Sequence, residues 1–105
     1  MIKNKAKFKA DGVLIWTWLH ENPLKEKREM PYDLKTKAVK YLSWCPFCEY
    51  YTEREYYTKN YIISCSECPL GDCRKYSWYW KWENAKTIKQ SQKYSSLILK
   101  TFQEW

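Results

Sequence analysis

The sequence predicts a small α+β domain in which a cysteine-rich β-hairpin, a zinc knuckle, is flanked by α-helices. Two observations lead to this prediction. Two Cys-x2-Cys pairs lie 16 residues apart in the middle of the chain, and a stretch without proline or glycine follows at the C-terminus. With 105 residues the chain is expected to form a single domain, residues 1–105, whose modest core would gain stability from a bound metal.

The N-terminal residues 1–10 are expected to be a basic arm, because lysines recur there at every second position. Val13–Leu19 then fits a helix that Asp11 caps and Pro23 ends. The alternation before Asp11-Gly12 also suits a β-hairpin over residues 2–18, which remains the alternative.

Residues 23–33 are strongly charged, so we expect a connector outside the core. Leu34, Ala38 and Leu42 recur every four residues, which predicts a short helix capped by Asp33. The cysteine module, residues 41–73, is rich in tyrosine between its two Cys pairs, and this composition predicts a two-stranded ribbon.

The C-terminal stretch, residues 82–103, predicts one long amphipathic helix. At about 100° per residue, Ile88, Ile98 and Phe102 share an apolar face. A separate basic stripe contains Lys86, Lys89, Lys93 and Lys100.

The cysteine spacing predicts a metal site. Five cysteines cannot pair completely as disulfides within one chain. Two Cys-x2-Cys turns supply the four corners of a tetrahedron, so the predicted zinc ligands are Cys45, Cys48, Cys65 and Cys68. Cys73 is an alternative ligand, in place of Cys65, and iron is the less favoured metal.

A redox role for the first Cys pair is a remote alternative. Cys45-Pro-Phe-Cys48 resembles the dithiol of glutaredoxins, which are thiol-disulfide oxidoreductases. That resemblance implies a strand before the motif and a βαβ unit, whereas the residues after Cys48 favour a hairpin. A second Cys pair nearby also favours metal.

The sequence contains little that is typical of an enzyme active site. Two glycines exclude the glycine-rich loops of Rossmann and P-loop sites. His20 is the single histidine and lies beside a helix stop, so we expect a non-enzymatic protein with no small-molecule substrate. The expected location is cytoplasmic, since neither a secretory signal nor a membrane span is evident and clustered cysteines suit a reducing compartment.

The charge distribution predicts two kinds of binding surface. Residues 1–40 and 74–105 each carry +5, whereas residues 41–73 carry −3. The basic flanks are candidates for binding DNA or RNA, through Lys3, Lys5, Lys7, Lys9, Lys86, Lys89 and Lys93. The candidates for a protein partner are the acidic Glu49, Glu53 and Glu55 and the aromatic Trp78, Trp80 and Trp82, although such rings also serve as core.

The whole pattern resembles a group of small phage-encoded zinc-knuckle proteins, most of them uncharacterised. The resemblance rests on Trp16-x-Trp18-Leu19-x-Glu21-Asn22-Pro23, on Cys-x2-Cys followed by Cys-x2-Cys-Pro69-Leu70-x2-Cys73, and on Trp80-Lys81-Trp82. It implies a metal-binding accessory protein in the cytoplasm of an infected bacterium. We therefore expect stoichiometric inhibition of a host antiviral-defence or nucleic-acid-handling protein, with direct nucleic-acid binding as the alternative.

Overall fold

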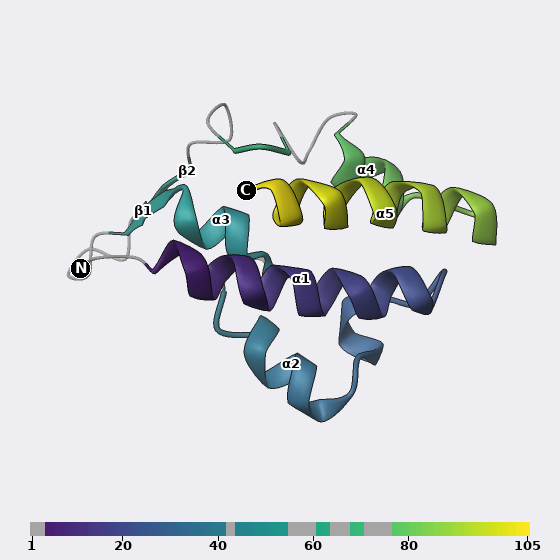
Figure 1. Ribbon diagram of the computed structural model, residues 1–105, viewed down its shortest axis with the longest axis horizontal. Coiled ribbons are helices and arrows are strands. Elements are labelled where there is room, and N and C mark those ends of the chain that lie inside the picture. Colours follow the sequence, from purple (N-terminus) through teal and green to yellow (C-terminus); the bar gives the residue numbers. More distant parts are fainter. Residues whose placement is uncertain (1–3, 42–43, 55–60, 64–67, 71–76) are drawn as a thin grey trace.

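Two long antiparallel helices form the centre of the protein. The computed structural model describes residues 4–41, 44–54, 61–63, 68–70 and 77–105. Helix α1 (Lys5–Glu21) runs beside helix α5 (Ile88–Glu104) in the opposite direction (Figure 1). Lys5 accordingly contacts Trp105 at one end of the pair, and His20 contacts Gln92 and Ser95 at the other.

Helix α1 begins earlier than the sequence predicts. The side chain of Asn4 accepts a hydrogen bond from the backbone N–H of Lys7 and caps the helix, which continues through Gly12. The predicted arm is therefore wrong for residues 5–10, which are helical, and the hairpin alternative is wrong as well. Lys3 lies outside the described residues. The alternating lysines led to a wrong prediction because they lie on a part of the helix that is exposed to solvent.

The predicted C-terminal helix is divided in two. Helix α4 (Trp78–Glu83) begins at the Ser77 cap and ends at Asn84, and α5 begins anew at the Thr87 cap. The boundary predicted at residue 82 is wrong, because Ser77 and Thr87 each accept a hydrogen bond from the backbone and start a separate helix. The predicted apolar face is confirmed for Ile98 and Phe102, which are fully buried, whereas Ile88 is exposed.

The charged connector contributes to the core. Its 3₁₀ turn η1 (Lys27–Glu29) leads to helix α2 (Tyr32–Ala38), which packs against α1 and confirms the predicted short helix. Lys27 and Met30 are only 8% and 4% exposed, so the expectation that residues 23–33 lie outside the core is wrong. Pro31, not Asp33, occupies the N-cap position of α2.

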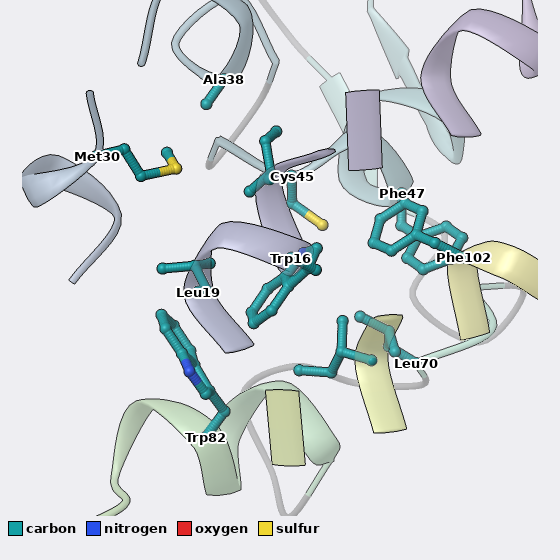
Figure 2. Close-up of a cluster of buried hydrophobic side chains, with 11 residues drawn as sticks. Trp16, Leu19, Met30, Ala38, Cys45, Phe47, Leu70, Trp82 and Phe102 are labelled. Atoms are coloured by element: carbon teal, nitrogen blue, oxygen red, sulfur yellow. The ribbon is translucent and has the colours of Figure 1, made fainter. Parts of the chain in front are cut away.

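Aromatic side chains make much of the core. Trp16 lies edge-on to Trp82, with ring centroids 4.8 Å apart, and Phe47 stacks on Phe102 at 3.8 Å. Figure 2 shows these rings in one cluster with Leu19, Met30, Ala38, Cys45 and Leu70, residues that come from distant parts of the chain. Because the chain has few aliphatic residues, its rings provide this packing.

The predicted α+β class is wrong. Helices form the described core, and the cysteine module itself opens with a helix, α3 (Pro46–Tyr50), that packs against α1. Strands β1 (Thr52–Arg54) and β2 (Tyr61–Ile63) pair antiparallel, with Glu53 opposite Ile62, but they form no layer of the kind that the sequence predicts. This ribbon has three residues in each strand and lies at the edge of a helical domain (Figure 1). The sequence predicted too large a part for the hairpin, because Phe47, which precedes the tyrosines, belongs to a helical turn and is buried in the core.

Within the described residues, none of the helices combines the length and the apolar character needed to cross a bilayer.

Candidate metal centre and binding surface

The first cysteine pair is built on the N-terminus of α3. Cys45 occupies the N-cap position, Pro46 begins the helix, and Cys48 lies within its first turn. Cys45 is 1% exposed and belongs to the core cluster, whereas Cys48 is half-buried and packs against it. The Cys-x2-Cys spacing therefore places one thiol inside the domain and the other near its edge.

The two thiols of this pair interact directly. A hydrogen bond with the Cys48 side chain, together with burial, raises the pKa of the Cys45 thiol well above its ordinary value of 9.0, while the charge of Lys27 acts to lower it. A redox nucleophile needs the opposite, an accessible thiol with a depressed pKa. Cys45, at 1% exposure, lacks the accessibility of such a nucleophile, and the oxidoreductase alternative for the pair stays a prediction.

A buried lysine lies beside this cysteine pair. The ammonium of Lys27 donates a hydrogen bond of 3.1 Å to the backbone carbonyl of Trp44. It also lies 4.5 Å from the ring centroid of Tyr79 and 5.6 Å from that of Trp16. Burial opposes its charge, but interactions with Tyr79, Cys45 and Cys48 outweigh burial and raise the pKa of Lys27 above its ordinary value.

The second half of the predicted metal site lies mostly outside the described residues. Cys68 is half-buried and packs against the core, but Cys65 and the alternative ligand Cys73 are outside the part of the chain that the structure describes. In that described part, no group of three or more His, Cys, Asp or Glu side chains converges as metal ligands.

Two polar groups lie in the region around Cys45. The indole N–H of Trp16 is buried and has no hydrogen-bond acceptor in the described part of the chain. Cys45 belongs to the same buried cluster (Figure 2), although its sulfur does not accept this N–H in the structure. Lys27 adds a positive charge. Cys45 and Cys48 therefore lie together as the first Cys pair requires, whereas Cys68, the third predicted ligand that the structure describes, does not converge with them.

The three candidate tryptophans have different environments. Trp82 is 8% exposed and packs on Trp16 in the core, and Trp80 is half-buried. Trp78 is 38% exposed and stacks on Tyr94 of α5, with ring centroids 6.1 Å apart and planes at 22°. Of the three, Trp78 offers the most surface to a partner.

Two lysines complete the surface around Trp78. The ammonium of Lys81 lies 5.1 Å from the Trp78 ring centroid and 5.9 Å from that of Tyr94, and Lys93 lies 5.6 Å from Tyr94. We refer to Trp78, Lys81, Lys93 and Tyr94 as the Trp78 patch. Sequence reasoning missed Lys81, although its i, i+3 spacing from Trp78 places both on one helix face. It also missed Lys27, whose charged neighbours Glu26 and Arg28 give no sign of burial.

The candidate basic residues form two separate groups. Lys5, Lys7 and Lys9 lie at the start of α1, beside the end of α5, whereas Lys86, Lys89 and Lys93 lie around the start of α5. A helix of 17 residues is about 25 Å long, so the two groups lie at opposite ends of the helix pair. They do not form one continuous basic surface.

The remaining candidates are described only in part. Glu49 is half-buried on α3, Glu53 lies in β1, and Glu55 is outside the described residues. His20 binds α5 through its Nδ1, which lies 3.2 Å from both the carbonyl oxygen of Gln92 and Oγ of Ser95. His20 therefore joins the C-terminal end of α1 to α5.

An open cleft of about 630 Å³ lies beside Lys27. Its walls include Trp44, Tyr79 and Trp82, and its rim carries both cations and carboxylates, among them Arg28 paired with Glu26. This mixture of charges favours no single ligand class.

Comparison with known proteins adds no further identification: no protein-family model, curated protein or solved structure matches this chain.

Proposed function

We propose that this protein is a non-enzymatic binding protein, stabilised by one zinc ion, that acts by occupying a partner protein. The observation that carries the proposal is the Trp78 patch, an exposed tryptophan stacked on a tyrosine with two ammonium groups against the rings. Exposed tryptophans rimmed by charge are typical of binding hot spots.

Zinc has a structural part in this proposal. Cys45, Cys48, Cys65 and Cys68 would hold the ion, with Cys73 as the alternative ligand. The ion would supply stability through tetrahedral thiolate coordination. The support comes from the spacing of the cysteines and from the direct interaction of Cys45 with Cys48, with the positive charge of Lys27 near enough to act on the Cys45 thiol.

The chemistry of the Trp78 patch indicates an acidic partner surface. The ring of Trp78 would bury apolar area at the centre of the contact, and Lys81 and Lys93 would pair with carboxylates around it. The resemblance to phage-encoded proteins indicates the class of partner, a bacterial protein of antiviral defence or nucleic-acid handling. Binding would block that protein stoichiometrically.

A capture experiment tests this proposal. The zinc-loaded protein, Trp78→Ala and the control Tyr32→Ala are immobilised and exposed to nuclease-treated bacterial lysate. Tyr32 is 80% exposed on α2, so its substitution removes an exposed aromatic ring away from α4. We expect the wild type and Tyr32→Ala to retain the same protein at equal stoichiometry and Trp78→Ala to lose it. Equal capture by Trp78→Ala would contradict the proposal.

Direct nucleic-acid binding is the second candidate, because aromatic rings beside cations also form platforms on which bases stack. Lys86 and Lys89 lie around the start of α5, the helix that contributes Lys93 and Tyr94 to the patch. Fluorescence anisotropy with single- and double-stranded oligonucleotides tests it. Binding should weaken steeply between 50 and 200 mM salt, in proportion to the number of phosphate contacts. Absence of binding near 50 mM salt would exclude this candidate.

A further inference from the structure

We infer that the open cleft beside Lys27 is a binding site for a small aromatic carboxylate, a ligand that is bound and not transformed. The inference goes beyond the proposed function, because the residues that line the cleft are not those of the Trp78 patch. The cleft volume of about 630 Å³ lies within the range of about 300–1,000 Å³ that is usual for small-molecule sites. The mixed charges on the rim select no ligand, so the choice rests on the interior.

The walls of the cleft are aromatic rings that packing holds in place. Tyr79 and Trp82 of α4 lie with their ring centroids 5.8 Å apart and their planes at 58°. Trp82 in turn packs edge-on against the fully buried Trp16. Rings that are fixed before a ligand arrives bind a flat apolar group at little cost in conformational entropy. The walls therefore favour a ligand with an aromatic body.

A buried ammonium lies against these walls. Lys27 is 8% exposed, and its Nζ lies 3.1 Å from the carbonyl oxygen of Trp44 and 4.5 Å from the ring centroid of Tyr79. All three residues line the cleft. A carbonyl and a phenol ring carry no net charge at neutral pH, so these two contacts leave the positive charge of the ammonium in place. Because electrostatic attraction is strongest where water is excluded, a carboxylate should bind here better than a neutral or cationic group.

The backbone of the cleft is strained at two positions. In the described part of the chain, the non-glycine residues with a left-handed backbone are Leu24, with a φ of 67°, and Trp44, with a φ of 55°. Both line this cleft. Leu24 is 47% exposed, so burial of its side chain offsets little of the strain. Strained residues cluster at ligand sites, where their conformation shapes the site. Their common location therefore supports a binding role for the cleft.

Three probes that share one ring system test the inference: 2-naphthoate, the neutral 2-naphthamide and the cationic 2-naphthylmethylamine. Isothermal titration calorimetry measures their dissociation constants for the reduced wild type, Ala85→Phe, Glu83→Lys and Trp78→Ala, and circular dichroism verifies that each variant folds. Ala85 is a half-buried residue of the lining, so Ala85→Phe places a ring in the cleft. Glu83→Lys replaces an exposed carboxylate of the lining with an ammonium. Trp78→Ala is the matched control, because it removes a ring of the same helix that does not line the cleft.

We expect the wild type to bind 2-naphthoate at least about tenfold more tightly than the other two probes. Ala85→Phe should weaken this binding by about tenfold or more, Glu83→Lys should strengthen it, and Trp78→Ala should leave it unchanged. Equal affinity for the three probes, or binding that Ala85→Phe leaves unchanged, would overturn the inference. Loss of binding in Trp78→Ala but not in Ala85→Phe would assign the ligand to the Trp78 patch and overturn it too.

Two further outcomes are decisive. Should Ala85→Phe not fold, Glu83→Lys decides, since its exposed position leaves the core unchanged: tighter binding of 2-naphthoate supports the inference, and unchanged or weaker binding overturns it. A wild type that binds no 2-naphthoate at millimolar concentration would overturn the inference without affecting the capture of a partner protein through the Trp78 patch.

Discussion

Gly12 of α1 lies directly against the ring of Phe102 of α5. A Cβ atom at residue 12 would lie 2.3 Å from Cδ1 and Cε1 of that ring, closer than side-chain carbons approach. Phe102 cannot move freely, because its ring also stacks on Phe47. The missing side chain of Gly12 therefore sets how closely the two central helices approach.

Replacing Gly12 with alanine should destabilise the protein. In an unconstrained helix the same change would add about 0.5–1 kcal/mol of stability. Here the methyl group overpacks the contact with Phe102, which typically costs about 1–3 kcal/mol. We expect a net loss in the free energy of unfolding, measured by urea denaturation of the zinc-loaded protein. A Gly12→Ala variant more stable than the wild type would show that α1 and α5 are not in this contact.

The buried pair of Asp11 and Tyr41 should make stability depend on pH. The Tyr41 hydroxyl donates a hydrogen bond to Asp11, and burial first, then this bond, raises the pKa of Tyr41 above its ordinary value of 10.0. The unfolded chain therefore loses the phenolic proton at a lower pH than the folded protein does. Stability from this group is complete below about pH 9 and declines as the pH rises beyond 10.

The substitution Tyr41→Phe isolates this contribution. At neutral pH we expect a loss of about 1.5–3 kcal/mol, since a hydrogen bond to a buried carboxylate is removed. Above pH 10 the difference between Tyr41→Phe and the wild type should shrink. Urea denaturation at several pH values measures both effects, with Tyr32→Phe as the exposed control. A difference that stays constant from pH 7 to 11 would contradict the assignment.

The backbone at Leu24 provides a third prediction. Leu24 has a φ of 67° and its side chain is 47% exposed, so it adopts a left-handed conformation without burying much apolar surface. Leu24→Gly should stabilise the protein by up to about 1 kcal/mol, because glycine adopts this conformation without strain. Leu14→Gly, at a similarly exposed position inside α1, should instead cost about 1 kcal/mol. Thermal unfolding of both variants checks the opposite signs.

The sequence predicted single helices better than it predicted how the helices pack together. The short helix around Leu34 and the buried face of Phe102 follow from apolar periodicity, which survives in the structure. The α+β prediction is wrong because two helices paired through Gly12, and not the tyrosine-rich ribbon, form the centre of the domain. A close approach between residues 90 positions apart leaves no local pattern.

The candidate site was likewise predictable only in part. The motif of Cys45 and Cys48 was evident from spacing, and its thiols do interact. Lys27 is buried although its segment is charged. Trp78 stacks on Tyr94 because α4 and α5 are separate helices. Both are consequences of tertiary packing.

The most direct test of the zinc-stabilised domain is metal analysis combined with unfolding. Protein purified under reducing conditions is analysed for zinc by mass spectrometry, and its helical circular dichroism is followed during heating with and without a strong chelator. We predict one zinc per chain and loss of cooperative unfolding once the zinc is removed, because coordination supplies folding free energy. A metal-free protein that keeps its helices and unfolds at the same temperature with and without chelator would contradict the account.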